Sequence, residues 1–393
     1  KSNLNLVTGT ILSTQKFNSR FFQTLDSGSQ LNPNPSIPGI DTSNFTNDTE
    51  YNFTDIYAGL RYRLKSGIFT FTPGVTVHSY TSENTQYGNE YFKDYSFTFL
   101  PELEILTQFK NSESLTFSYR KQVNFTDVNR IAKGIVANNY SSYFAGNSDL
   151  VNSTFHNLSL FYRSFNMFNN TSLFARVNYR KTADQVNNDT NFVPGSVVSS
   201  ATTINSPLDN ESLTAFFSAS KSIKKLQFRV GGNFNYNKSY QFLNTRENES
   251  KIYNTGINTR IRTNFRKAPN VSLNYRVSFS DQENSSRSEP FNSVTHSPSI
   301  DFDAYIWNSV TLTSDFTYNQ VRQNGEEAST YKIWNAKLAY RKDKDAKWEY
   351  ELVASNLLST GSEVTVGQGI ISTNINERFI LPRLLSFRVR YQL

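Results

Sequence analysis

Apolar and polar residues alternate along most of this chain, and the alternation predicts β-strands. In residues 253–266, Tyr, Thr, Ile and Phe occupy every second position, and Asn, Gly and Arg occupy the positions between them. Residues 271–280 repeat the pattern, which is typical of a strand with one apolar face. Pro269 in the intervening segment cannot donate a ladder hydrogen bond, so the two segments are expected to form an antiparallel hairpin.

The same alternation continues through the chain and predicts about 16 strands, many of about 10–14 residues. Further clear examples are residues 114–120, 173–180, 226–236 and 385–393. Short connections are expected near residues 65–67, 110–113, 168–170, 223–225, 267–270, 307–309 and 342–346. Longer connections, rich in Asn, Ser, Thr and Asp, are expected near residues 15–48, 82–89, 125–150, 184–210, 243–250, 282–292, 323–328 and 359–368.

Long strands with one apolar face, and turns that alternate between short and long, describe an all-β fold, a transmembrane antiparallel β-barrel. A tilted strand of this length suits a hydrocarbon layer about 30 Å thick. Lipid cannot satisfy a free backbone edge, so the sheet is expected to close, with apolar residues toward lipid and polar residues toward the lumen. Pro73, Pro101 and Pro298 interrupt the pattern and are expected at bulges or strand ends.

The composition supports a single barrel domain over residues 1–393 rather than two or three globular domains. Only 37% of the residues are hydrophobic, yet the chain has 32 Phe and 22 Tyr against one Met. Without Cys, the chain has no disulfide, thiol nucleophile or cysteine metal site. The sequence opens at Lys1 without an initiator Met or an apolar signal segment, so we expect it to be processed or truncated.

The last strand has an apolar residue at every second position, at Leu385, Phe387, Val389, Tyr391 and Leu393. This row resembles the C-terminal signature by which bacterial outer-membrane proteins are recognised for barrel insertion. That signature usually ends in an aromatic residue, and Leu393 departs from it.

Several longer stretches follow one another in a fixed order: a Pro-led strand at 100–107, an Arg-containing strand at 114–124, the Gly-Asn-Ser-Asp-Leu segment at 146–150, and residues 356–358 and 381–393. Together they are similar to the C-terminal barrel portion of TonB-dependent-receptor-like outer-membrane β-barrel proteins. The Arg-Pro-Ser that often follows the second stretch in that family is replaced here by Phe-Thr-Asp at 125–127. The resemblance implies a 22-strand barrel of which this chain is the C-terminal part, without its N-terminal plug. A complete, narrower barrel is the competing interpretation.

The resemblance implies a location in the bacterial outer membrane, with long loops extracellular and both termini periplasmic. It also implies TonB-dependent, energised uptake of a nutrient that the loops bind. Partners would then be outer-membrane lipids and TonB, the latter through a segment absent from this sequence. Two alternatives stay open: a structural scaffold that binds surface lipoproteins or other outer-membrane subunits, and a passive porin.

Forty Lys and Arg against 33 Asp and Glu give a net charge of +7, but the basic residues are not clustered along the chain, which argues against nucleic-acid binding. Many lie on the polar parity of strands, and we expect these to face the lumen: Arg176, Arg229, Arg260, Arg262, Arg276 and Lys337. Glu351 is also expected to face the lumen, and Lys337 should lie nearly opposite it if residues 342–346 form a simple hairpin. The arginine excess would face an acidic plug or attract anionic solutes, and a ladder of cross-strand ion pairs is the alternative.

No motif indicates an enzyme or a cofactor site. A Gly-x-Ser-x-Gly elbow and the nucleotide-binding fingerprints are missing from the sequence. His78, His156 and His296 lie apart, without a neighbouring ligand at metal spacing. Tyr140, Tyr143 and Phe144, in a long loop, are candidates for contact with a ligand or partner.

Overall fold

The computed structural model describes residues 2–31, 45–139, 141–192, 195, 198–266, 269–287, 289–306, 309–343, 345–368 and 373–392, and these are almost entirely β-structure. Sixteen strands of this part build one antiparallel wall. They are β1 (Ser2–Arg20), β4 (Thr46–Ser66), β5 (Phe69–Gln86), β6 (Asn89–Lys110), β7 (Glu113–Asn124), β10 (Ser153–Asn166), β11 (Thr171–Ala183), β14 (Asn210–Ile223), β15 (Leu226–Leu243), β16 (Arg246–Thr263), β17 (Asn270–Asn284), β18 (Phe291–Ile306), β19 (Val310–Gln323), β20 (Glu326–Tyr340), β21 (Trp348–Ser355) and β24 (Leu384–Tyr391). The predicted number of strands is confirmed.

Smaller elements belong to the connections at one end of the wall. They are β2 (Gln23–Thr24), β3 (Gln30–Leu31), α1 (Val128–Ile131), β8 (Val136–Asn139), β9 (Ser142–Ala145), β12 (Val186–Phe192), β13 (Ser199–Asn205), β22 (Ser362–Gln368) and β23 (Thr373–Phe379). Within the described ranges, no helix has the length and apolarity needed to cross a bilayer.

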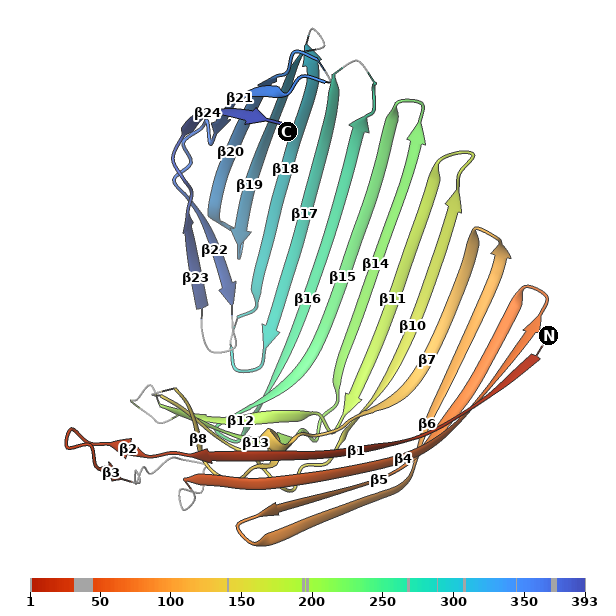
Figure 1. The fold of residues 1–393 in the computed structure, drawn as a ribbon, viewed down its shortest axis with the longest axis vertical. Coiled ribbons are helices and arrows are strands. Elements are labelled where there is room, and N and C mark those ends of the chain that lie inside the picture. Colours follow the sequence, from red (N-terminus) through yellow and green to blue (C-terminus); the bar gives the residue numbers. More distant parts are fainter. Residues whose placement is uncertain are drawn as a thin grey trace.

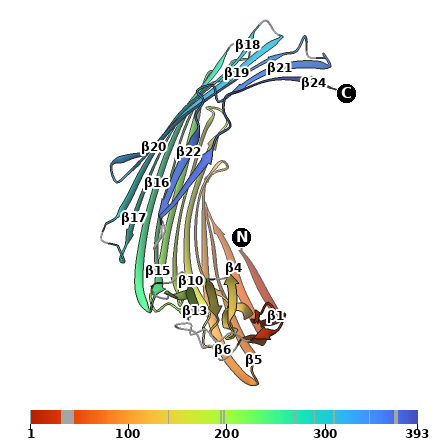
Figure 2. The ribbon, with the colours of Figure 1, turned by 90° about the vertical axis from the view of Figure 1, so that its left-hand side faces the viewer.

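Each strand of the wall pairs with the next one along the chain, from β1–β4 to β21–β24. The wall curves into an open arc, with β1 at one edge and β24 at the other (Figures 1 and 2). Both edges lie far apart, so the expected closure is not present in these sixteen strands. Both chain ends lie at the short-turn end of the wall (Figure 1).

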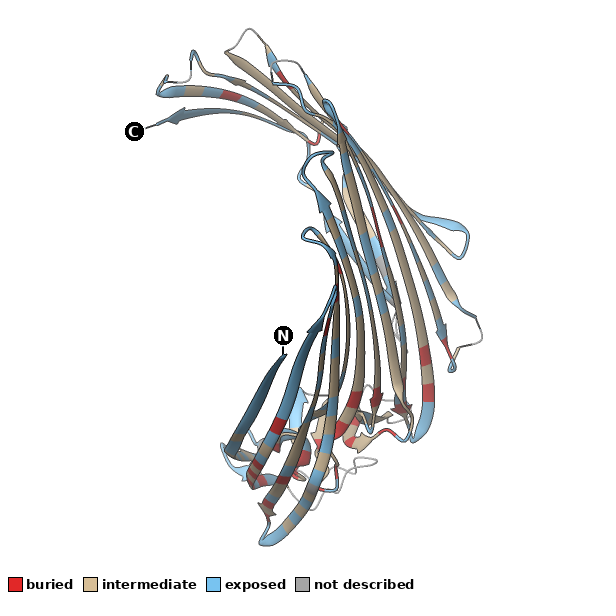
Figure 3. Ribbon diagram, turned by 90° about the vertical axis from the view of Figure 1, so that its right-hand side faces the viewer, coloured by how far each residue is buried: buried red, intermediate tan, exposed pale blue. Residues whose placement is uncertain are grey.

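One face of the wall keeps its large apolar side chains uncovered. Leu6 is 72% exposed, Ile56 61%, Phe99 60% and Leu273 47%. Soluble monomers rarely expose apolar patches beyond a few hundred Å², and here most strands of the wall carry large exposed apolar side chains. Exposed positions recur along the strands (Figure 3). A sheet with this strand length, this alternation and an uncovered apolar face is the wall of a transmembrane β-barrel.

Several strands are longer than predicted, because segments expected to be loops continue the ladder. The connections expected near 82–89, 243–250 and 323–328 are two-residue turns at Tyr87–Gly88, Asn244–Thr245 and Asn324–Gly325, all with positive φ. This backbone matches type I′ hairpin turns. Strands of 18 residues span roughly 60 Å, about twice the hydrocarbon thickness. Beyond the lipid both faces are wet, so Asn, Ser and Thr can occupy either parity of a strand there.

The three prolines lie inside strands, which corrects the expectation of bulges or strand ends. Pro73 is opposite Leu103, Pro101 is opposite Val75, and Pro298 is opposite Tyr275. The register is continuous through these pairs. The register shifts lie elsewhere, for example between His78 and Tyr80. A proline lacks only its own N–H, so it can stay in a strand where that position donates no ladder bond.

Candidate functional site

A layer formed by two long connections covers part of the polar face at the long-loop end of the wall. The connection between β7 and β10 carries α1, β8 and β9, and the connection between β11 and β14 carries β12 and β13. β9 pairs with β13 in parallel, which joins the two connections into one layer (Figure 1). Arg61 lies on the polar face of β4, and Tyr51 lies on the same face because the two are an even number of residues apart. The Tyr51 side chain is only 2% exposed beneath this layer. The loops therefore pack on the polar face.

Buried contacts hold the layer against the wall. Its apolar core comprises Tyr51, Phe53, Tyr80, Val128, Ile131 and Leu150. Gln86 donates to the carbonyl of Ile131 over 3.0 Å, and Asn47 donates to the carbonyl of Gly134 over 3.0 Å. Burial raises the pKa of Tyr51 to about 12. This layer is an ordered part of the fold.

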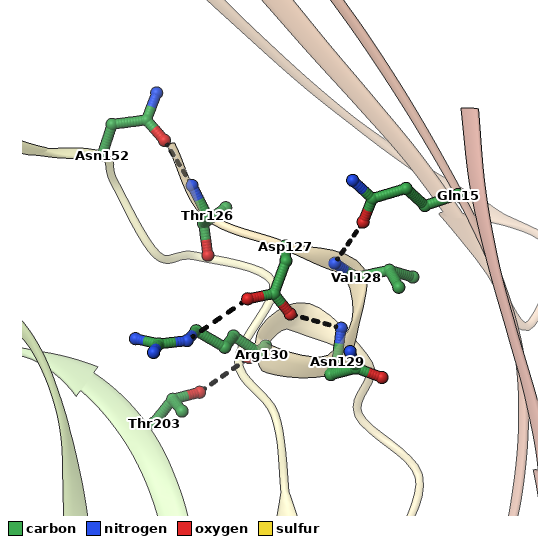
Figure 4. Close-up of polar contacts among 8 residues, drawn as sticks. All are labelled: Gln15, Thr126, Asp127, Val128, Asn129, Arg130, Asn152 and Thr203. Carbon is green, nitrogen blue, oxygen red and sulfur yellow. Dashed lines mark hydrogen bonds and ion pairs between the residues drawn. The ribbon is translucent and has the colours of Figure 1, made fainter. Parts of the chain in front are cut away.

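The short helix α1 is fixed by its first residues (Figure 4). Asp127 accepts from the Asn129 N–H over 3.0 Å and lies 3.4 Å from the Arg130 guanidinium. The Val128 N–H donates to Gln15 of β1 over 3.1 Å, and Thr203 of β13 donates to the Arg130 carbonyl over 2.7 Å. Asp127 therefore serves as the N-cap of a helix that links β1 to the loop layer.

The loop aromatics singled out in the sequence take part in this packing. Tyr143 and Phe144 lie in β9 and are half-buried. The Tyr143 ring contacts the Phe21 ring edge-on, with centroids 5.8 Å apart. Phe144 pairs with Ala201 of β13. Tyr140 lies outside the described residues.

Ion pairs cross the polar face near both edges of the wall. Glu102 of β6 binds Arg61 of β4 through two contacts, one of them 2.8 Å long, and lies 3.6 Å from Arg120 of β7. At the other edge, Glu351 is fully buried, 3.5 Å from Lys337 and 3.2 Å from Arg390. The residue directly opposite Glu351 on β20 is Ala339, so Lys337 reaches it diagonally.

The middle of the polar face carries arginines without acidic partners. They are Arg176, Arg229, Arg260, Arg262 and Arg276, and none of them lies within 4.0 Å of a carboxylate among the residues that the structure places. Arg260 donates instead to Ser272 over 2.9 Å, and Arg176 donates to Asn178 over 3.1 Å. Cross-strand ion pairs are thus found near the edges of the wall, whereas the arginines in its middle have no carboxylate partner among the described residues.

The C-terminal strand presents its predicted apolar row along the free edge of the sheet. Leu385, Phe387, Val389 and Tyr391 are between 48% and 67% exposed. Tyr391 is opposite Trp348, and their rings are 4.8 Å apart. Leu393 lies outside the described residues.

The three histidines each have one polar partner. His78 contacts the fully buried Asp55 at 2.9 Å, and the ring of Tyr57 stacks on it at 5.2 Å. His156 and His296 contact the hydroxyls of Tyr119 and Tyr275 at 2.9 and 2.8 Å. The Asp55–His78 pair has no local sequence signal, because 23 residues separate the two. In the part of the chain that the structure describes, no group of three or more His, Asp or Glu could hold a metal ion.

A third charged cluster stabilises the tip of the β15–β16 hairpin, at the long-loop end of the wall. Glu249 lies 2.6 Å from Lys251 and 3.4 Å from Lys238, and it accepts from the Tyr240 hydroxyl over 2.8 Å. The Lys251 ammonium and these other donors lower the pKa of Glu249 to about 2. The same contacts raise the pKa of Lys251.

No protein-family model matches this sequence, and no curated protein is significantly similar to it. Among solved structures, the copper transporter OprC is 11% identical, with 90% of this chain and 59% of that chain covered and a TM-score of 0.41. OmpT, an outer membrane protein of Vibrio cholerae, is 11% identical, with 99% and 97% covered and a TM-score of 0.32. The FpvAI–pyocin S2 complex gives 9% identity, 88% and 67% coverage and a TM-score of 0.24. The chain spans 59% of the length of the OprC chain, and its fold assignment rests on its own strand registers and exposed apolar face.

Proposed function

We propose that this chain is the wall of a TonB-dependent, receptor-type barrel of the bacterial outer membrane, which takes up a nutrient bound by its outer loops. The long loops then face the outside, and both termini face the periplasm. The observation that carries the proposal is the pair of free sheet edges, β1 and β24, on a wall of sixteen strands. The protein acts by binding and transport and has no catalytic role.

The free edges favour a barrel wider than these sixteen strands. A porin closed by them alone would need β1 to pair with β24, whereas the described partner of β1 is β4 and that of β24 is β21. Unpaired backbone groups are not tolerated in lipid, because each costs several kcal/mol. A barrel in which further strands pair with β1 and β24 would satisfy both edges, and this is the arrangement that we propose.

The arginines of the polar face support a lumen that holds something acidic. A face with free guanidinium groups is most stable when hydrated or opposite anions, such as acidic residues of a plug or an anionic solute. The loop layer on the same face narrows the entrance at the long-loop end. Both features suit a gated receptor better than an open pore.

The decisive experiment is the intact mass of the protein from its native outer membrane, together with its co-purifying subunits. A mass far above 44.9 kDa, from a chain with an N-terminal lumen domain, is the expected result. A mass near 44.9 kDa without additional strands would overturn the receptor and leave the porin or the scaffold. Single-channel conductance would separate those two, because only a porin conducts strongly.

The scaffold alternative is favoured by one specific feature, the hairpin of β22 and β23, which pairs outside the main sheet. In β23, Ile375 is 69% exposed and Phe379 is 78% exposed, and Leu381, just after this strand, is 77% exposed. Apolar side chains this exposed at the long-loop end suit contact with another protein. Stoichiometric surface lipoproteins in the purified sample would support this alternative.

A further inference from the structure

Four of the unpaired arginines gather on three neighbouring strands. Arg229 of β15 is directly opposite Arg260 of β16, and Arg262 is the next residue on the same face of β16. Arg276 of β17 is opposite Asn258, the residue on the same face of β16 that precedes Arg260. Like charges directly opposite each other destabilise an antiparallel pair. Arginine cannot lose its proton to relieve the repulsion.

The acid nearest in register is already engaged. Asp301 of β18 is opposite Ser272, which in turn is opposite Arg262, so Asp301 lies two strands away from this arginine. Asp301 accepts a 3.0 Å hydrogen bond from Asn274. The four guanidinium groups are thus left to face the lumen, and Arg229, Arg262 and Arg276 are exposed.

A recess in the wall lies beside this arginine cluster, and Arg276 is the arginine of the four that lines it. Two reciprocal pairs lie at or next to the recess: Gly231 is opposite Asn258, and Asn233 is opposite Gly256. A Cβ on Gly231 would lie 2.8 Å from Asn258 Oδ1, and one on Gly256 would lie 2.5 Å from Asn233 Oδ1. The glycines therefore let both amides lie flat against the wall. They leave a cavity of about 370 Å³ that is also lined by Asn254, Arg276 and Ser278.

We propose that this recess and the cluster of four arginines beside it form an oxyanion site, which binds the carboxylate or phosphate group of a polar solute. Planar guanidinium groups bind such oxygens through paired hydrogen bonds. Asn233 and Asn258 supply donors and acceptors for hydroxyl or amide groups on the rest of the solute. The site deepens the proposed function, on which it rests, by assigning an anionic, hydrogen-bonding substrate class.

The same chemistry could come from a free solute or from an acidic side chain of a segment inside the lumen. Inorganic phosphate is the probe that separates them. It is titrated calorimetrically into the full-length protein in detergent, as wild type and as Arg229→Ser/Arg260→Ser. The control is Arg163→Ser, which removes a polar-face arginine of β10 that donates to Ser114 and belongs neither to the recess nor to the arginine cluster.

We expect phosphate to bind the wild type and the control alike, and to bind the double variant at least tenfold more weakly. If phosphate binds none of the three and only the double variant unfolds at a lower temperature, an acidic side chain fills the site. Equal phosphate binding by all three, or no difference in either measurement, would overturn the proposal. Arg229→Gln/Arg260→Gln, which keeps more of the side-chain volume, replaces the serine variant if that one fails to fold.

Binding at equilibrium needs no energy from the inner membrane, so the two proposals can fail separately. Phosphate binding without energised uptake would leave the oxyanion site standing and remove the receptor. Uptake of a neutral nutrient without phosphate binding would support the receptor and overturn the oxyanion site.

Discussion

A single carboxylate, Glu351, holds together the last three strands of the wall. It is fully buried between Lys337 of β20 and Arg390 of β24, and it sits on β21 between them. Removing one member of a buried ion pair costs about 3–5 kcal/mol, because the remaining charge stays uncompensated. Here the two cations are 40% and 59% exposed in their side chains and keep part of their hydration.

We therefore expect Glu351→Gln to lower the free energy of unfolding by about 1–3 kcal/mol. Urea unfolding in lipid vesicles measures this change. Glu349→Gln is the matched control, because Glu349 lies on the same face of β21 and has no ion pair among the described contacts. Equal losses in the two variants would show that Glu351 contributes only as a polar side chain.

The tip of β15 and β16 should respond to acid through Glu249. The folded state holds the pKa of this carboxyl at about 2, below the value of about 4.3 expected in an unfolded chain. The unfolded state therefore binds more protons between these values, and the stabilisation by Glu249 is lost as the pH falls through this window. Hydrogen exchange at residues 246–251 should be slower in wild type than in Glu249→Gln at pH 6, and the difference should vanish near pH 2. A difference independent of pH would exclude the charge as its cause.

At the scale of elements, the loop layer depends on close backbone approaches. Gly146 donates to the Ala132 carbonyl over 2.7 Å. A Cβ at Gly146 would lie 2.5 Å from the Arg130 carbonyl oxygen and 2.6 Å from that of Ala132. Backbone atoms cannot rotate away as a side chain can, so the layer would have to shift.

We expect Gly146→Ala to destabilise the loop layer by about 1–3 kcal/mol and to leave the strand ladder intact. Limited proteolysis should then cut within residues 126–150 faster than in wild type. Gly361→Ala is the control, because a Cβ there would meet no atom within 4 Å. Unchanged cleavage in Gly146→Ala would contradict the tight packing of this layer.

At the scale of the whole molecule, the free edges make a prediction about closure. The chain contains no Cys, so a disulfide can form only between cysteines that are introduced by substitution. Leu6→Cys with Leu60→Cys joins residues that are opposite each other across β1 and β4, and it should form a disulfide under mild oxidation. Leu6→Cys with Phe387→Cys probes the β1 and β24 edges and should stay reduced, because disulfides need Cα atoms within about 7 Å.

Intact mass before and after thiol labelling shows whether each cysteine pair is reduced or joined by a disulfide, because only reduced cysteines take up the label. Variants with Leu4→Cys or Thr8→Cys in place of Leu6→Cys cover the neighbouring registers of the edge pair. A disulfide between the edges in any of these registers would mean that sixteen strands close by themselves. The wall would then be a complete porin-sized barrel.

Periodicity along the chain was sufficient to predict the strands, the two faces and most of the short turns. An uncovered apolar face needs only alternate Leu, Ile, Val and aromatic residues, and this pattern is local in the sequence. Turns such as Asn244–Thr245 were predicted as long loops, because polar strand residues above the membrane have the composition of loops. Pro101 was assigned to a bulge or a strand end because the sequence does not reveal which N–H groups the ladder leaves unused.

The sequence by itself determined the fold class, the strand count and the parity on which the arginines lie, since each of these depends on residues two positions apart. Only the tertiary structure decided which charges meet. It brought Asp55 to His78 and Arg390 to Glu351, and it placed Arg229 opposite Arg260 with no acid beside them. Strand register decides such contacts, and it is fixed by the whole ladder together. For the same reason, the packing of the two long connections into one layer on the polar face could not be read from either connection alone.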